Sequence, residues 1–219
     1  MLKKTLVLLF VCFNVSTSCA QEFKSSISTI TTEIFEQMPY SWKDINPVPL
    51  ADLRCISISH WGFDGQVHQG SLIIHEKVAQ EVVEIFNEIF DSHFPIEKMA
   101  FVDLYQGDDE LSAQANNSYS FCCRPNTSFP NVFSKHSYGL AIDINPLYNP
   151  YQKGELIVPK CGAQYLNRES VVKGMIDHES ICYQAFFKRG WTWGGDWKEP
   201  RGYVDYQHFE KDPKVVLRE

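Results

Sequence analysis

The chain has 219 residues, a length that suits one domain with a substantial core. Hydrophobic residues make up 44% of it and charged residues 21%, a composition that excludes a disordered protein. The net charge of -7 argues against a nucleic-acid partner and against electrostatic docking on an anionic membrane. We therefore expect a globular protein, and we predict that it is a monomer.

The first twenty residues have the pattern of an export signal. Two lysines precede a short apolar run over residues 6–13, and small residues follow up to Ala20. The run is too short to span a membrane, so we predict a signal peptide over residues 1–20 and no transmembrane segment in the mature chain. Lipid anchoring at Cys19 is an alternative. Either reading predicts an exported protein, periplasmic or extracellular.

Export changes the interpretation of the cysteines. Their spacing does not resemble a zinc ribbon, and an oxidising compartment favours disulfides. We expect at least one disulfide, with at least one thiol left over because the number is odd. The sequence does not fix the pairing among the five cysteines of the predicted mature chain, which are Cys55, Cys122, Cys123, Cys161 and Cys182.

The first half of the mature chain contains strand and helix patterns. Residues 21–52 are expected to form an N-terminal extension, with a helix and then a loop over residues 22–49. The main domain is expected over residues 53–219. Alternating apolar residues predict strands over 53–60 and 66–74, and an apolar stripe at helical spacing predicts a helix over 76–90. A further strand is expected over 99–105 and a short helix over 108–115.

The second half is more irregular. Residues 116–133 and 146–161 are expected to be loops, which carry function more often than regular elements do. A buried strand is predicted over 139–145, a helix over 180–188 and a strand-rich stretch over 191–210. The whole pattern lacks a regular β-α-β alternation, so we predict an α+β fold with a central, mainly antiparallel sheet and flanking helices.

The stretch around His136 combines a strand pattern with metal-binding side chains. Strand geometry places Leu140, Ile142 and Ile144 on one face, and Gly139, Ala141 and Asp143 on the other. The small residues on the second face leave room for a group above them. If the chain turns after His136, its imidazole can return over Gly139 toward Asp143. The pair then offers one nitrogen and one oxygen ligand, which suits zinc.

A second stretch can complete the site. His208 offers a third ligand, and Asp205 lies three residues earlier. Three protein ligands leave the fourth zinc position open for water, and a nearby carboxylate outside the ligand set can take a proton during attack. Strict strand geometry would put Asp205 and His208 on opposite faces, so we expect a turn or bulge between them.

Together these motifs resemble a known family. The pattern Ser-x-His-x-x-Gly-x-Ala-x-Asp, followed by Asp-x-x-His, is similar to that of the D-alanyl-D-alanine carboxypeptidase family of zinc peptidases. This family includes VanY-type enzymes and L-alanyl-D-glutamate endolysins, and its superfamily includes the hedgehog signalling domain. The similarity also extends to residues 60–65, 116–118 and 141–146, and covers about residues 53–210.

The resemblance implies roles for individual residues. It implies one zinc ion per chain held by His136, Asp143 and His208, with Asp205 as the general base. It implies that Arg124 binds substrate and stabilises the developing oxyanion, a task that suits the planar fork of a guanidinium. Ser134 is expected to help position the substrate.

Two classes of function remain open at this stage. The first is a zinc metallopeptidase that cuts peptidoglycan stem peptides, either as a D-Ala-D-Ala carboxypeptidase or as an L-Ala-D-Glu-type endopeptidase. The second is a zinc-containing module that binds the cell wall or a protein without catalysis. Asp205 and Arg124 favour the enzyme. Trp191, Trp193 and Trp197 could line a sugar-binding cleft, although core packing is expected for at least one of them.

Overall fold

The computed structural model describes residues 21–127, 129–197 and 202–217, so the predicted signal peptide and Cys19 lie outside the described residues. Strands β1 (Ser25–Thr29), β2 (Leu53–Trp61) and β3 (Val67–His75) form one antiparallel sheet in that order. This pairing confirms the two strands expected after residue 53. A helix followed by a loop was expected over residues 22–49. The helix is wrong in its extent, because β1 comes first and only Thr32–Phe35 is helical (α1).

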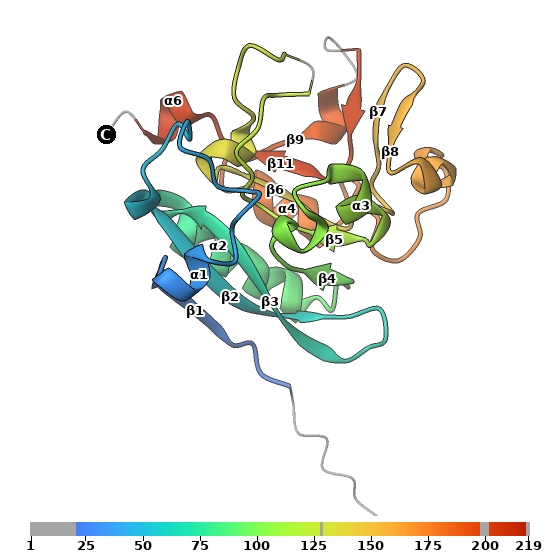
Figure 1. Ribbon diagram of the computed structural model, residues 1–219. Helices are drawn as coiled ribbons and strands as arrows, with labels where there is room; N and C mark the ends of the chain where they lie inside the picture. The colour runs from blue at the N-terminus through green and yellow to red at the C-terminus, as the bar shows by residue number, and fades with distance from the viewer. Residues whose placement is uncertain (1–20, 128, 198–201, 218–219) are drawn as a thin grey trace, which may run out of the picture.

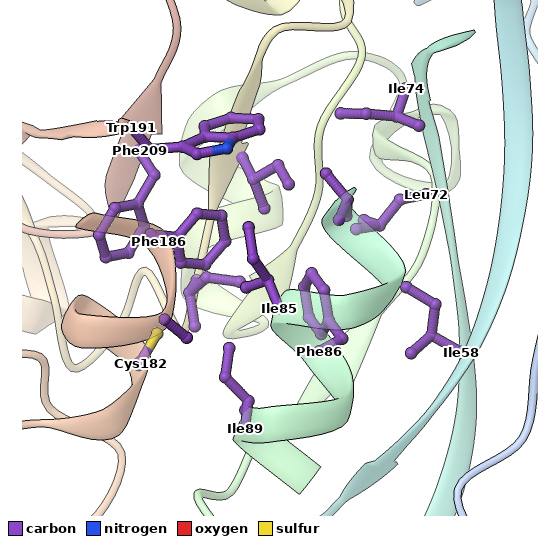
Figure 2. Close-up of a cluster of buried hydrophobic side chains, with 14 of the residues drawn as sticks. Ile58, Leu72, Ile74, Ile85, Phe86, Ile89, Cys182, Phe186, Trp191 and Phe209 are labelled. Atoms are coloured by element: carbon purple, nitrogen blue, oxygen red, sulfur yellow. The ribbon is translucent and has the colours of Figure 1, made fainter. Parts of the chain in front are cut away.

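Helix α2 (Glu76–Asp91) is the longest element and confirms the predicted helix. His75 begins it, since its Nδ1 accepts a hydrogen bond from the Lys77 amide at 3.2 Å. The apolar stripe of the helix is buried throughout. Figure 2 shows Ile85, Phe86 and Ile89 between strand residues of the first sheet and an aromatic group that includes Phe186.

Two further antiparallel sheets carry the second half of the chain. One has the order β6-β11-β9, formed by Ala141–Asp143, His208–Glu210 and Thr192–Trp193. The other has the order β10-β7-β8, formed by Val204–Asp205, Tyr151–Lys153 and Leu156–Val158. A short parallel pair joins β4 (Lys98–Met99) to β5 (Asn117–Ser118). The described chain is therefore α+β, as predicted, but it has several small sheets in place of one central sheet (Figure 1).

Shorter helices complete the described part of the chain: α3 (Asp109–Gln114), α4 (Ile181–Phe187) and α6 (Pro213–Val216). The first two agree with the short helix expected over residues 108–115 and the helix expected over 180–188. A strand expected over 99–105 is wrong, because the chain turns into a 3₁₀ helix at Val102–Tyr105. The hairpin of β7 and β8 lies in a stretch that was expected to be a loop. No helix among the described residues is long and apolar enough to cross a membrane.

The core links the first sheet to the sheet that holds β11. Phe209 on β11 stacks on Phe186 with ring centroids 4.1 Å apart and planes 8° apart. Phe186 in turn packs edge-on against Phe86 of α2 at 6.3 Å. These contacts hold the strand that contains His208 against α2 (Figure 2). The packing of α2 therefore fixes the position of β11 in the fold.

The cysteines do not follow the prediction. All five are free thiols in the structure: Cys55, Cys122, Cys123, Cys161 and Cys182. Cys182 is fully buried in the core on α4, and Cys161 is exposed. The expected disulfide is therefore not found, and apolar packing rather than cross-linking holds these segments.

The packing of α2 generates a stability prediction. Phe86 is 1% exposed, so Phe86→Ala should lower the free energy of unfolding by about 3–5 kcal/mol. Phe187→Ala is the matched control, because Phe187 is 60% exposed and should cost far less. Denaturant unfolding of both variants measures the difference. Equal losses would contradict the assignment of Phe86 to the core.

Candidate metal centre and catalytic cleft

The three predicted metal ligands lie together in the interior. His136 belongs to the 3₁₀ helix Lys135–Tyr138, while Asp143 and His208 are directly paired across β6 and β11. His136 Nε2 lies 3.2 Å from His208 Nδ1 and 3.3 Å from Asp143 Oδ2, and His208 Nδ1 lies 2.8 Å from Asp143 Oδ1. All three residues are buried. The structure thus confirms that the proposed ligands converge, and this group could hold a metal ion.

Each imidazole also makes a contact through its outer ring nitrogen, the one that faces away from the other histidine. His136 Nδ1 faces the backbone oxygen of Ser120, and His208 Nε2 lies 3.1 Å from Glu210 Oε2. If each outer nitrogen donates its ring proton to that acceptor, the inner nitrogens are free to bind a cation. The inner nitrogens, His136 Nε2 and His208 Nδ1, then point their lone pairs at each other. Such outer partners commonly fix the orientation and tautomer of a metal-binding histidine.

The donor set fits a zinc ion. Two lone pairs and a carboxylate meet with no positive charge among them, which is unfavourable unless a cation or an extra proton joins them. Ligands at zinc bond lengths of about 2.0–2.1 Å lie roughly 3.3 Å apart in a tetrahedron. The two ligand separations that involve His136, 3.2 and 3.3 Å, are close to this value, and the third, 2.8 Å, is shorter.

The pKa shifts of His208 and Asp143 also indicate that the site favours positive charge. Burial lowers the pKa of His208, but hydrogen bonds to Asp143 and Glu210 outweigh it and raise the pKa to about 10. Burial raises the pKa of Asp143, but the charges and hydrogen bonds of His136 and His208 outweigh it and hold that pKa well below its usual range. A proton therefore binds tightly where a metal would, and the two compete for the site.

One detail of the expected packing is wrong. Gly139 was expected to leave room above it for the imidazole of His136. In the structure, a Cβ at Gly139 would instead meet the backbone nitrogen of His75 at 2.7 Å. Gly139 has φ +64° and ends the 3₁₀ helix in the left-handed conformation, which favours glycine. The absence of a side chain at Gly139 thus permits the turn that brings His136 back to Asp143. It also permits the close approach of this turn to β3.

Asp205 lies in a different sheet from the ligands. It ends β10, and only Tyr206 and Gln207 separate it from His208 on β11. The expected turn between the two residues is therefore confirmed. Trp193 Nε1 holds this turn by donating to the Tyr206 carbonyl oxygen at 2.8 Å. Gly194 lies directly against Asp205, since a Cβ there would be 2.3 Å from the Asp205 carbonyl oxygen.

The Asp205 carboxyl group is buried and only partly paired. Its Oδ1 has no hydrogen-bond partner among the described residues, an uncommon condition for a buried polar atom. Burial raises its pKa to about 7, and this effect outweighs the charge of His208, which lowers the pKa. The charge of Asp143 adds a smaller increase, and Gln207 and Arg124 lower the pKa slightly. Such a carboxyl group is costly to the fold and available to a ligand.

Arg124 reaches the same cleft. Its Nη2 lies 3.2 Å from both Asp109 Oδ2 and the Tyr119 hydroxyl oxygen, and its Nη1 lies 3.3 Å from Thr127 Oγ1. Its Nε is buried without a partner among the described residues. Ser134 instead caps the 3₁₀ helix, since its Oγ accepts a hydrogen bond from the His136 amide. Its side chain also borders the cleft, so the expected role in positioning substrate stays a prediction.

The cleft is asymmetric. A space of about 40 Å³ is lined by Arg124, Ser134, Asp205 and two of the ligands, His136 and His208. Beyond Arg124 and Asp205 it continues into a pocket of only about 70 Å³. On the other side, past Tyr203 and Glu210, it meets a groove of about 540 Å³. A separate cavity of about 360 Å³ beside β3 contains none of these donors.

The sequence did not identify several neighbours of the site. Glu210 could have been found, because it lies two residues after His208 and alternation along a strand puts both on one face. Tyr119, which stacks on His136 at 4.9 Å, and Asp109 carry no local signal. Of the three tryptophans, Trp191 and Trp193 are buried in the core, and Trp197 alone lines the cleft, with its ring 5.2 Å from that of His208.

Removal of a ligand should abolish metal binding. His136→Ala should lower the zinc content from about one ion per chain to near zero, because two ligands bind zinc far more weakly than three. His178→Ala is the control, since the side chain of His178 is 63% exposed and faces Asp196. Elemental analysis of the purified proteins measures the metal. Full zinc content in His136→Ala would contradict the assignment.

The buried carboxyl group of Asp205 predicts a pH dependence of stability in the metal-free protein. Its pKa rises from 3.8 to about 7 on folding, so ionisation opposes folding increasingly as the pH rises through this range. Asp205→Asn should therefore raise the melting temperature at pH 8 and have little effect at pH 4. A gain that is equal at both values would contradict the burial of this charge.

Comparison with known proteins adds an independent observation. A family model described as D-alanyl-D-alanine carboxypeptidase matches residues 128–211, less than half of the chain. The matched segment contains His136, Asp143, Asp205 and His208, while Arg124 precedes it. Searches of curated proteins and of solved structures gave no significant match. The resemblance inferred from the motifs is thus confirmed over residues 128–211, which are similar to the D-alanyl-D-alanine carboxypeptidase family.

Proposed function

We propose that this protein is a zinc-dependent peptidase that hydrolyses peptide bonds in the stem peptides of bacterial peptidoglycan. The observation that carries the proposal is the meeting of three kinds of group in one cleft. Two of the ligands, His136 and His208, line one space together with Asp205, which has an unpaired oxygen, and Arg124, which has an unpaired nitrogen. The third ligand, Asp143, lines the adjoining pocket that Asp205 and Arg124 also border. Catalytic sites are typically recognised by such convergence.

Each part of the cleft has a chemical task in this proposal. A zinc ion held by His136, Asp143 and His208 would supply Lewis acidity, which polarises a peptide carbonyl and acidifies water. Asp205 is outside the ligand group, so its free oxygen can accept a proton from water and pass it to the leaving amine. Arg124 can donate to the oxyanion or to a substrate carboxylate.

The shape of the cleft favours a carboxypeptidase over an endopeptidase. The pocket beyond Arg124 and Asp205 is about 70 Å³, whereas the groove on the other side is about 540 Å³. A peptide would place its longer part in the groove and a small terminal residue in the narrow pocket. The positive charge of Arg124 suits the terminal carboxylate there. A cut at an internal bond would require the narrow side to accept a longer chain.

A non-catalytic binding module accounts less well for the cleft. Such a module needs the metal and a surface, but it does not need a buried carboxylate such as Asp205, whose ionisation opposes folding. We further propose that the protein acts outside the cytoplasm, where peptidoglycan lies. The export signal expected over residues 1–20 supports this location, and the lipid anchor at Cys19 stays an alternative.

Two substitutions test the roles of the polar groups. Asp205→Ala should retain zinc but lower kcat by about 10²–10⁴-fold, because it removes proton transfer. Arg124→Ala should also retain zinc and lower kcat/KM, because it weakens binding and transition-state stabilisation together. Hydrolysis of a synthetic stem peptide that ends in D-Ala-D-Ala, with zinc determined on the same samples, measures both effects. Asp91→Asn, an exposed change at the end of α2, is the control.

The outcomes separate the alternatives. Undiminished cleavage by Asp205→Ala would remove it as the base. Digestion of muropeptides followed by product masses distinguishes release of one terminal residue from an internal cut. If the zinc-loaded, unmutated protein cleaves no stem peptide, the binding-module reading replaces the proposal.

A further inference from the structure

Asp109 lies at the edge of the cleft, outside the segment that the family model matches. It is the first residue of α3, which Asp108 begins by accepting a hydrogen bond from the Leu111 amide at 2.9 Å. The two carboxylate oxygens of Asp109 have different partners. Oδ2 lies 3.2 Å from Arg124 Nη2, and Oδ1 accepts a hydrogen bond from the Tyr119 hydroxyl at 2.9 Å.

The three side chains form a closed ring of contacts. The Tyr119 hydroxyl donates to Asp109 and accepts from Arg124 Nη2 at 3.2 Å. Burial raises the pKa of Tyr119 well above its usual value, so the hydroxyl stays neutral and can fill both roles. A guanidinium held by two partners in fixed directions loses most of its freedom to rotate.

Arg124 needs such a partner. Its side chain is only 20% exposed, and an unpaired charge is costly at that depth. Among the described residues, Asp109 is the carboxylate with which Arg124 forms an ion pair. The pair uses Nη2, while the buried Nε has no partner in the described chain. The ion pair, together with the contacts to Tyr119 and Thr127, thus restrains the guanidinium where it lines the cleft.

Tyr119 links this ring to the metal centre. Its ring stacks on His136 with centroids 4.9 Å apart and planes 17° apart. Its backbone also pairs with Asp143, through hydrogen bonds of 3.1 and 2.9 Å in the two directions. The guanidinium is therefore tied, through one residue, to two of the three ligands.

We infer that Asp109 is a positioning residue, which aims the Arg124 guanidinium into the cleft at a fixed place relative to the ligand group. Asp109 acts through Arg124 and Tyr119, so it matters only while Arg124 is present. The inference rests on the proposed function, since it assigns Asp109 to the same reaction. It adds a residue on α3 to the groups on which substrate hydrolysis depends.

A double-mutant cycle tests the inference. Asp109→Asn keeps the shape of the side chain and removes its charge, and it should lower kcat/KM for the stem peptide by about tenfold or more. In the Arg124→Ala background, the same change should alter kcat/KM by less than about twofold. Tyr119→Phe keeps the ring on His136 and removes the hydroxyl, so it should show the same dependence on Arg124 with a smaller loss.

Controls separate positioning from damage to the fold. Zinc content should stay near one ion per chain in every variant, and the melting temperatures should remain above the assay temperature. Asp91→Asn should leave kcat/KM unchanged. If Asp109→Asn does not fold, the cycle with Tyr119→Phe replaces it.

Equal losses in the two backgrounds would overturn the inference and leave the proposed function intact. So would an Asp109→Asn variant that folds, binds zinc and cleaves at the full rate. Failure of the unmutated, zinc-loaded protein to cleave any stem peptide would instead refute the proposed function, and the inference with it.

Discussion

The organisation of the site depends on two imidazole nitrogens that face each other across 3.2 Å beside a buried carboxylate. When the outer nitrogens of His136 and His208 donate to the Ser120 carbonyl and Glu210, the inner nitrogens can take up either a proton or a metal ion. The arrangement is stable only when positive charge enters the gap. A bound proton and a bound metal ion are the two ways of supplying it, and the hydrogen bonds from His208 to Asp143 and Glu210 raise the pKa of His208 in the same direction.

The surrounding fold holds His136, Asp143 and His208 close to one another. Asp143 and His208 are cross-strand partners, so the sheet itself sets their separation. Phe209, the next residue along β11, stacks on Phe186 and ties the strand to α2. His136 arrives from a separate 3₁₀ helix, whose left-handed end at Gly139 returns the chain to β6. Hydrophobic packing thus holds polar groups at distances that they would not keep alone.

Features that depend on a local sequence pattern could be predicted from the sequence, and features that depend on tertiary packing could not. Strands β2 and β3 and helix α2 have strong periodicity, and they were found within one or two residues. The candidate ligand group could be named from the sequence because its motifs are local, and the structure brings its three members together. The role of Asp205 stays a prediction. Strands were expected over residues 139–145 and 191–210, where β6, β9, β10 and β11 lie. The β7–β8 hairpin was missed because each of its strands is only three residues long, too short for a pattern. Asp109 was missed because its pairing with Arg124 depends on tertiary packing alone.

The free cysteines have a chemical consequence of their own. Thiolates rather than thiols react with oxidants and alkylating agents. Burial raises the pKa of Cys122 to about 12 and that of Cys182 further, so both stay protonated at neutral pH. Cys161, in contrast, is exposed on the 3₁₀ helix Lys160–Leu166. Among the five cysteines that the structure describes, a thiol-specific label would therefore attach first to the one on that helix, which packs beside β8. Such a label would report on movement of the β7–β8 hairpin next to Asp205.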